Sequence, residues 1–293
     1  MVVTQTREHS VPMSRETSRS DGVPARRSAS FWLTGLVAML AAVASAAGLF
    51  APGLFRDPPN WAAQARGTDL ITLAVAVPLL VTAPLLAARG SLWARFVWLG
   101  ALGYTLYMYG IAAFDVAFNP LFLVYVALLS LSVFSIIILI TELDARAIHV
   151  RAGTDLTVRT TAAYLLGLAA LFSLLWMRDI VPALAHGANP ASLNGTTLPT
   201  NPVHVLDLSL LLPLAALSGI WLWQCRPRGY LAASVMLTTL TMVGASVVSG
   251  IVFEYRNDAS VSLAPVPVLA LVTLIGLGLL VVYLRHFNRV LAK

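Results

Sequence analysis

Residues 120–141 read PLFLVYVALLSLSVFSIIILIT, an apolar run that contains no charged side chain. A helix needs about 20 mainly apolar residues to cross a membrane, because the hydrocarbon core is about 30 Å thick and each residue adds about 1.5 Å. Further runs of this kind lie on both sides of it. Each run is continuous and lacks the short alternating segments of barrel strands, which predicts α-helices. The eight predicted spans are roughly 31–51, 69–88, 93–114, 120–141, 160–177, 205–224, 230–252 and 264–284.

The composition indicates the same fold class, an all-α polytopic integral membrane protein. Hydrophobic residues make up 58% of the 293 residues and charged residues only 11%, whereas soluble domains carry about 25% charged residues. Too few charges are present to cover a water-exposed surface. The composition therefore excludes a cytosolic enzyme, a secreted disulfide scaffold and a nucleic-acid-binding domain. The single cysteine, Cys225, also excludes an internal disulfide and a multi-cysteine zinc site.

The arginines predict the orientation of the spans. With eight spans both termini lie on one side of the membrane, and most of the 19 Lys and Arg residues fall in segments on that side. Cytoplasmic loops are enriched in Lys and Arg, so both termini are predicted to be cytoplasmic. The short loops and the use of arginine in place of lysine suggest a bacterial inner membrane. The basic residues on the opposite side are Arg56, Arg66, Arg178 and Arg256.

The chain is predicted to consist of a tail and two halves. Residues 1–30 are rich in Ser, Thr and Arg and are expected to form a disordered cytoplasmic tail. Residues 31–150 and 151–293 each contain four spans. The second half also has an extended outer loop over 180–203.

The two halves carry similar markers in the same order. Asp69 and Asp207 lie at the second span of each half, and Asp115 and Glu254 lie at the end of each third span. The members of these pairs are 138 and 139 positions apart (207 − 69 and 254 − 115). Because each half contains an even number of spans, we predict a parallel repeat about a pseudo-two-fold axis along the membrane normal.

Acids at the outer helix ends are the first candidate site residues. Asp69 and Asp207 are predicted at helix N-termini, where a carboxylate can serve as an N-cap or as a ligand. Asp115 and Glu254 are predicted near helix C-termini, where the helix dipole disfavours a negative charge. Each of these two acids therefore needs a cation, a proton, an arginine or water. Asp57, by contrast, is expected to be a loop residue in water.

His204 lies three residues before Asp207, and Arg66 occupies the same place before Asp69. Residues at i and i+3 share one face of a helix. Carboxylates around one imidazole can bind a divalent cation or relay protons, so His204 and Asp207 are candidate metal ligands. The competing interpretation is a histidine that is hydrogen-bonded at the membrane interface. The sequence identifies no cofactor.

Tyrosines on the third span form a second polar feature. Tyr104, Tyr107 and Asp115 are spaced to lie on one helical face. Tyr104 lies about ten residues below the outer interface, which is too deep for the aromatic belt of a membrane protein. Its hydroxyl must therefore hydrogen-bond to another helix or line a polar crevice.

Three classes of function remain. One is a binding or transport protein, because ionisable groups inside a membrane usually have such roles. The others are a non-catalytic scaffold or partner subunit and a membrane-embedded metal-dependent enzyme, although the common hydrolase and nucleotide-binding motifs are absent from the sequence. The expected partners are the lipid bilayer and a small cation or polar ligand, with no nucleic acid. A binding site would bring the candidate residues around one cavity, and these are Arg66, Asp69, Tyr104, Tyr107, Asp115, His204, Asp207 and Glu254.

Overall fold

A computed structural model describes residues 29–142 and 156–291 of the chain. Within these two ranges the regular structure is helical, without β-strands. The tail predicted over 1–30 lies almost wholly outside the described residues, so its disorder stays a prediction.

The described residues contain eight helical spans that are long and apolar enough to cross a membrane, in agreement with the predicted all-α, multi-span fold. Three spans of the first half consist of one helix each, as do three of the second half. These helices are α1 (Ala29–Phe50), α4 (Leu92–Asp115), α5 (Phe122–Thr141), α6 (Leu156–His186), α9 (Pro227–Asn257) and α10 (Val266–Leu291).

The second span of each half is compound, because a π-helical segment separates two α-helices. A proline follows each segment at the start of the next helix, Pro78 in one half and Pro213 in the other. Proline lacks an N–H and its ring clashes with the carbonyl four residues earlier, and a π-bulge is one way for a helix to accommodate such a break. The first compound span is α2 (Pro59–Ile71), η1 (Thr72–Ala76) and α3 (Val77–Ala88), and the second is α7 (Pro202–Leu206), η3 (Asp207–Leu211) and α8 (Leu212–Trp223).

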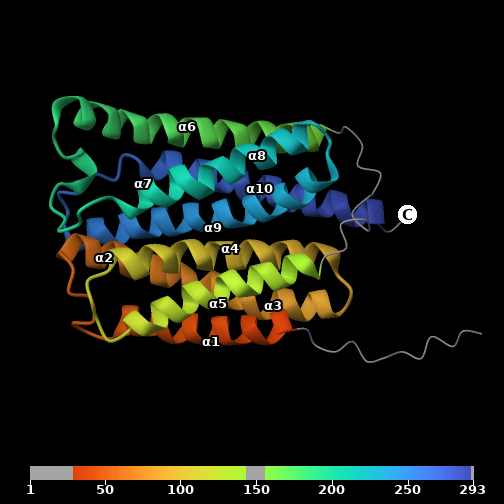
Figure 1. The fold of residues 1–293 in the computed structure, drawn as a ribbon, viewed down its shortest axis with the longest axis horizontal. Coiled ribbons are helices and arrows are strands. Elements are labelled where there is room, and N and C mark those ends of the chain that lie inside the picture. The colour runs from red at the N-terminus through yellow and green to blue at the C-terminus, as the bar shows by residue number, and fades with distance from the viewer. Residues whose placement is uncertain (1–28, 143–155, 292–293) are drawn as a thin grey trace, which may run out of the picture.

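The spans form one elongated bundle in which the helices of each half pack against one another (Figure 1). In the first half α1 contacts α3 and α5, and α4 contacts α3 and α5. In the second half α6 contacts α8, and α9 contacts α8 and α10. The halves meet where α9 packs against both α4 and α2. At this boundary a Cβ atom on Gly67 would lie 2.6 Å from the backbone of Gly250, so the glycines allow α2 and α9 to touch backbone to backbone.

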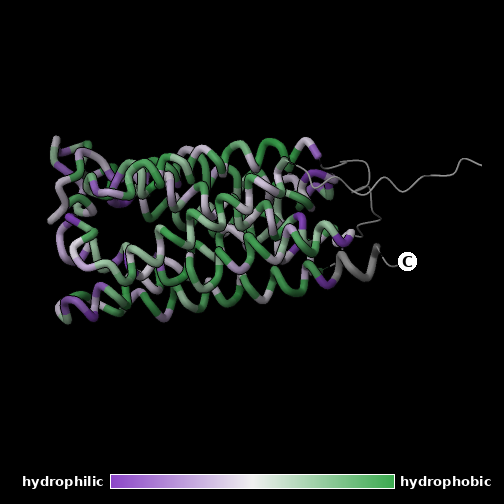
Figure 2. The backbone as a smooth tube through the Cα atoms, turned by 90° about the horizontal axis from the view of Figure 1, so that it is seen from below, coloured by the Kyte–Doolittle hydropathy of each residue, from purple (hydrophilic) through white to green (hydrophobic). Residues whose placement is uncertain are grey.

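Polar residues gather at the two ends of the bundle, and a hydrophobic band lies between them (Figure 2). This distribution is the one expected of a multi-pass membrane protein. The first described residue, Ala29, and the last, Leu291, lie at the same end of the bundle (Figure 1). We call the opposite end the distal end.

Two predicted spans were too short. The second span begins at Pro59 rather than near residue 69, and α6 continues to His186 rather than ending near residue 177. The extra turns of α2 are polar, and those of α6 begin with the charged pair Arg178 and Asp179, so an estimate based on continuous hydrophobicity ends before them. In the structure the added residues of α2 pack against α9, and this tertiary contact keeps them helical. The outer loop after α6 is therefore shorter than the predicted 180–203.

Candidate functional site

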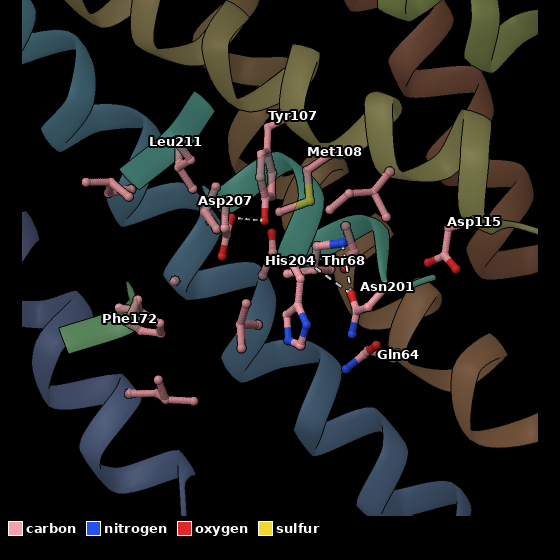
Figure 3. A pocket seen from close by; sticks show the side chains of 18 of the residues that line it. Gln64, Thr68, Tyr107, Met108, Asp115, Phe172, Asn201, His204, Asp207 and Leu211 are labelled. Carbon is pink, nitrogen blue, oxygen red and sulfur yellow. Dashed lines mark hydrogen bonds between the residues drawn. The ribbon is translucent and has the colours of Figure 1, made fainter. Parts of the chain in front are cut away.

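A cavity of about 780 Å³ opens near the distal end of the bundle and is lined by residues from both halves. Small-molecule sites usually have volumes of about 300–1,000 Å³, so its size is suitable for a ligand. Most of its wall is apolar, and polar groups project into it from several helices (Figure 3). We call it the distal pocket, and its titratable lining residues other than tyrosines are Asp57, Asp69, Asp115, His204 and Asp207.

Asp207 is held by side chains from two other spans. The hydroxyl of Tyr107 on α4 donates a hydrogen bond to Oδ1 of Asp207 across 2.7 Å, and the indole Nε1 of Trp176 on α6 donates to Oδ2 across 2.9 Å. Each carboxylate oxygen can accept a further hydrogen bond. Asp207 is therefore fixed in orientation and keeps acceptor capacity toward the pocket.

His204 lies one helical turn before Asp207 and is 6% exposed. Its ring packs against the indole of Trp176 with centroids 4.5 Å apart. The ring nitrogens form no hydrogen bond within the described part of the chain. Figure 3 shows the imidazole projecting into the pocket, on the side away from the hydrogen bond between Tyr107 and Asp207. His204 is therefore a buried side chain with free polar atoms that a ligand can reach.

The N-cap interpretation of Asp69 and Asp207 is wrong. Asp69 lies well inside the compound span that begins at Pro59, so it has no free helix end beside it. Helix α7 is instead capped by Asn201, whose side chain accepts hydrogen bonds from the backbone N–H groups of Val203 and His204 at 3.0 and 3.3 Å. Asparagine followed by proline is a common signal for the start of a helix. This pair identifies Asn201 as the N-cap, and Asp207 has no part in the cap.

Asp69 occupies a recess on α1 that a glycine leaves open. A Cβ atom on Gly48 would collide with the Asp69 carboxylate. The carboxylate also hydrogen-bonds the Ser45 side chain, and the Ser45 hydroxyl lies 3.2 Å from the hydroxyl of Tyr109. Asp69 itself lines the distal pocket, whereas Gly48 and Ser45 lie outside its lining.

Asp115 lies at the end of α4 and is 8% exposed. Its Oδ1 atom is buried without a hydrogen-bond partner among the described residues, although the carboxyl group hydrogen-bonds Trp61 and lies near Asp57. The prediction placed Asp57 in water, but it is only half exposed and lines the pocket. Its Oδ1 accepts a hydrogen bond from the backbone N–H of Ala117 at 2.9 Å, and its Oδ2 is buried with no partner in the part of the chain that the structure describes.

Three predicted site residues do not line the pocket. Tyr104 is fully buried behind its wall, where the hydroxyl lies 2.9 Å from Thr72 Oγ1 and 2.7 Å from Ser246 Oγ. This contact confirms that the deep hydroxyl hydrogen-bonds to other helices. Arg66 lies on α2 outside the lining, and Glu254 lies on α9, also outside it.

No group of three or more His, Cys, Asp and Glu side chains in the described ranges is close enough to hold a metal ion. His204 and Asp207 therefore lack the further protein ligand that a typical metal site needs. We therefore do not propose a metal centre at His204 and Asp207.

The structure brings five of the eight predicted residues to one cavity: Asp69, Tyr107, Asp115, His204 and Asp207. Sequence reasoning missed Trp176, which binds Asp207 and packs on His204 from a helix predicted to end just beyond it. It also missed Gly48, because no local pattern shows that a distant carboxylate fills the space beside it. No protein-family model, curated protein or solved structure matches this chain.

Proposed function

We propose that this protein is a ligand-binding membrane protein of the transport type, and that it takes a small cation or a hydrogen-bond-donating ligand into the distal pocket. One observation carries the proposal. Asp69, Asp115, Asp207 and His204 line a single ligand-sized cavity, and the described lining includes no Lys or Arg.

Charge complementarity supports this ligand class. Acids withdrawn into a membrane protein are costly unless a cation, a proton or hydrogen bonds compensate them. Protein donors compensate Asp207, but Asp115 Oδ1 has none among the described residues. A ligand that brings positive charge or N–H and O–H donors would satisfy these oxygens, whereas an anion would be repelled.

The two alternative functions receive less support. A scaffold would have its acids dispersed or paired with arginines, and it has no use for a cavity of about 780 Å³. A metal-dependent enzyme would need three or more close ligands, and the described part of the chain offers no such group. The lining residues instead combine acceptors with apolar surface, which is typical of a binding pocket.

We also infer that the two halves are parallel repeats that build the pocket together. Three kinds of landmark are shifted by 135 positions between the halves (207 − 72, 213 − 78 and 225 − 90). They are the start of the π segment, the proline after it and the hairpin residue with positive φ. In this register Asp69 corresponds to His204, not to Asp207. The landmark pairs are Thr72 with Asp207, Pro78 with Pro213 and Gly90 with Cys225.

The distribution of arginines supports a pocket that faces the outside of the cell. The distal end carries few basic residues, and under the positive-inside rule it is the non-cytoplasmic end. This orientation, in a bacterial inner membrane, would give a ligand access from outside the cytoplasm.

Ligand-induced stabilisation of the purified full chain tests the binding function. The probes are small ammonium and guanidinium cations, and the control compounds are carboxylates of the same size. A ligand at about 100 times its Kd stabilises the folded state by about 2.7 kcal/mol, which is readily measured as a rise in Tm. We expect at least one cation to produce such a rise and the carboxylates to produce none.

Asp207→Asn should weaken that effect, because it removes the charge that the ligand meets and keeps the shape of the side chain. Glu254→Gln is the matched control, since Glu254 is a half-buried acid outside the pocket. Equal loss in both variants would show that binding depends on overall charge and would contradict the proposed site. No stabilisation of the wild-type chain by any cation would contradict the proposed function.

A further inference from the structure

We infer that the ligand of the distal pocket is an amphiphilic cation, with an amine-type head and an apolar chain, and that it reaches the pocket from the membrane between α6 and α10. This inference rests on the proposed binding function and specifies its ligand. The supporting observations are the shape of the part of the pocket that the second half of the chain lines, and the position of the polar groups in that part.

Helices α6 and α10 are joined near the middle of the bundle and separated toward the distal end. The Tyr164 hydroxyl donates a hydrogen bond to the backbone oxygen of Val272 at 2.9 Å, and Gly276 packs closely against the same hydroxyl. Distal to this contact both helices line the pocket, with Leu168, Leu171, Phe172 and Leu175 on α6 and Val268 and Leu269 on α10.

The gap faces the hydrocarbon region of the membrane. Leu171 and Val268 line the pocket and are 54% and 63% exposed, and the same two helices carry Leu174 and Leu271, which are 70% and 59% exposed and lie outside the lining. Within a membrane-spanning segment such exposed side chains contact lipid. The apolar wall of the pocket is therefore continuous with the lipid-facing surface, and an apolar chain can pass from one to the other without crossing water.

The corresponding helices of the first half show no such gap. In that half α1 packs against α5, and Leu128, Ser132 and Ser135 of α5 are fully buried. By contrast, between residues 266 and 275 α10 has no buried residue. Because the gap between α6 and α10 occurs in only one half, it does not follow from the helix arrangement that the two halves share.

The polar end of this part of the pocket determines the head group. Asp207 and the free ring nitrogens of His204 lie where α7 and η3 meet α6, with Asp207 at the Nε1 edge of the Trp176 indole and the His204 ring packed against the indole. A carboxylate and an aromatic face attract a cation. The described lining has no Lys or Arg to bind a phosphate or carboxylate head. The chemistry therefore favours a positively charged amphiphile over an anionic lipid.

Photo-crosslinking of the full chain in lipid nanodiscs tests this inference. The probe is a long-chain primary alkylamine that carries a diazirine on its chain. The comparison ligands are the carboxylate with the same chain and a short-chain amine with the same head. We expect saturable labelling of residues 164–176 and 265–273 by the amine, competed by unlabelled alkylamine and not by the carboxylate. The long-chain amine should compete at least about tenfold better than the short one, because burying about two methylene groups has that effect.

Two pairs of variants test where the head group of the ligand binds and where its chain enters the pocket. Asp207→Asn should reduce the affinity for the long-chain amine about tenfold, and Glu254→Gln should leave it unchanged. Val268→Trp should block the gap and reduce labelling by the long-chain amine. Leu271→Trp is its control, because Leu271 is 59% exposed on the same helix and does not line the pocket. Retained affinity of Val268→Trp for the short amine shows that the pocket is intact.

The outcomes separate this inference from the proposed function. If the short amine binds as tightly as the long one and Val268→Trp has no effect, the ligand does not use the gap, and the inference fails while the binding function stands. Equal labelling by the carboxylate overturns the assignment of the head group. If neither amine binds saturably, the proposed function fails together with the inference.

Discussion

The indole Nε1 of Trp176 donates a hydrogen bond to Oδ2 of Asp207 across 2.9 Å, and this bond joins α6 to the π segment of the sixth span. The same indole packs against His204 with ring centroids 4.5 Å apart. One side chain thus positions both the acid and the imidazole of the pocket. Because Trp176 belongs to a helix that borders the gap toward the membrane, it links the polar end of the pocket to its apolar wall.

Trp176→Phe should lower the stability of the unliganded protein and strengthen cation binding. The substitution keeps an aromatic ring near His204 but leaves Asp207 with one donor instead of two. Loss of a hydrogen bond to a charged group costs about 1.5–3 kcal/mol, so we expect a lower Tm without ligand. The Tm titration should then show a higher ammonium affinity, because the cation compensates an acid that has lost a donor. Trp223→Phe, at an exposed position outside the distal pocket, is the control and should bind normally.

Gly48→Ala should destabilise the protein, because the added Cβ collides with the Asp69 carboxylate. Overpacking a well-packed site typically costs about 1–3 kcal/mol, and we expect a clear fall in Tm in detergent. Gly35→Ala is a matched control on the same helix, since a Cβ there meets no atom within 4 Å. If both variants melt at the wild-type temperature, Asp69 does not occupy the recess on α1.

Tyr104→Phe and Tyr107→Phe should have different effects although the two tyrosines lie one turn apart on α4. Tyr104→Phe leaves the buried hydroxyls of Thr72 and Ser246 without their shared partner, and we expect a loss of stability of about 1–3 kcal/mol with unchanged ligand affinity. Tyr107→Phe removes a donor from Asp207 in the pocket and should change the affinity for ammonium ions. Thermal unfolding with and without ligand measures both effects. A changed ligand affinity in Tyr104→Phe together with an unchanged one in Tyr107→Phe would contradict the proposed site.

The orientation of the pocket can be measured in intact cells. A cytoplasm-only reporter fused after Lys293 should be active, and one inserted near Asn194 should be silent. In a Cys225→Ser background, Ser192→Cys should react with a membrane-impermeant maleimide added from outside, because Ser192 lines the distal pocket. Protection of Ser192→Cys by a bound ammonium ligand would further connect the label to the site. An active reporter near Asn194 would show that the arginine distribution does not predict the orientation here.

Local information in the sequence was sufficient for the membrane-spanning fold. Runs such as 120–141 are too long and too apolar for a soluble helix bundle, and a helix is the structure that satisfies every backbone group of a single span in lipid. The depth of Tyr104 likewise required either a hydrogen-bond partner on another helix or a polar crevice, and the structure supplies two partners. These conclusions depend on residue type and spacing along one helix, which the sequence states directly.

Tertiary structure decided the parts that depend on residues far apart in the chain. Residues 59–68 are too polar to predict a membrane helix, and they become helical in contact with α9. Of the two interpretations of Asp69, an N-cap or a ligand, the cap is wrong: Asp69 occupies a recess beside Gly48, 21 positions away (69 − 48). The meeting of His204, Asp207 and Trp176 at one end of a cavity, with Asp115 elsewhere along the same wall, depends on how α4, α6 and the sixth span cross. The sequence specifies each helix through local periodicity, but the relative positions of the helices follow from packing over the whole bundle.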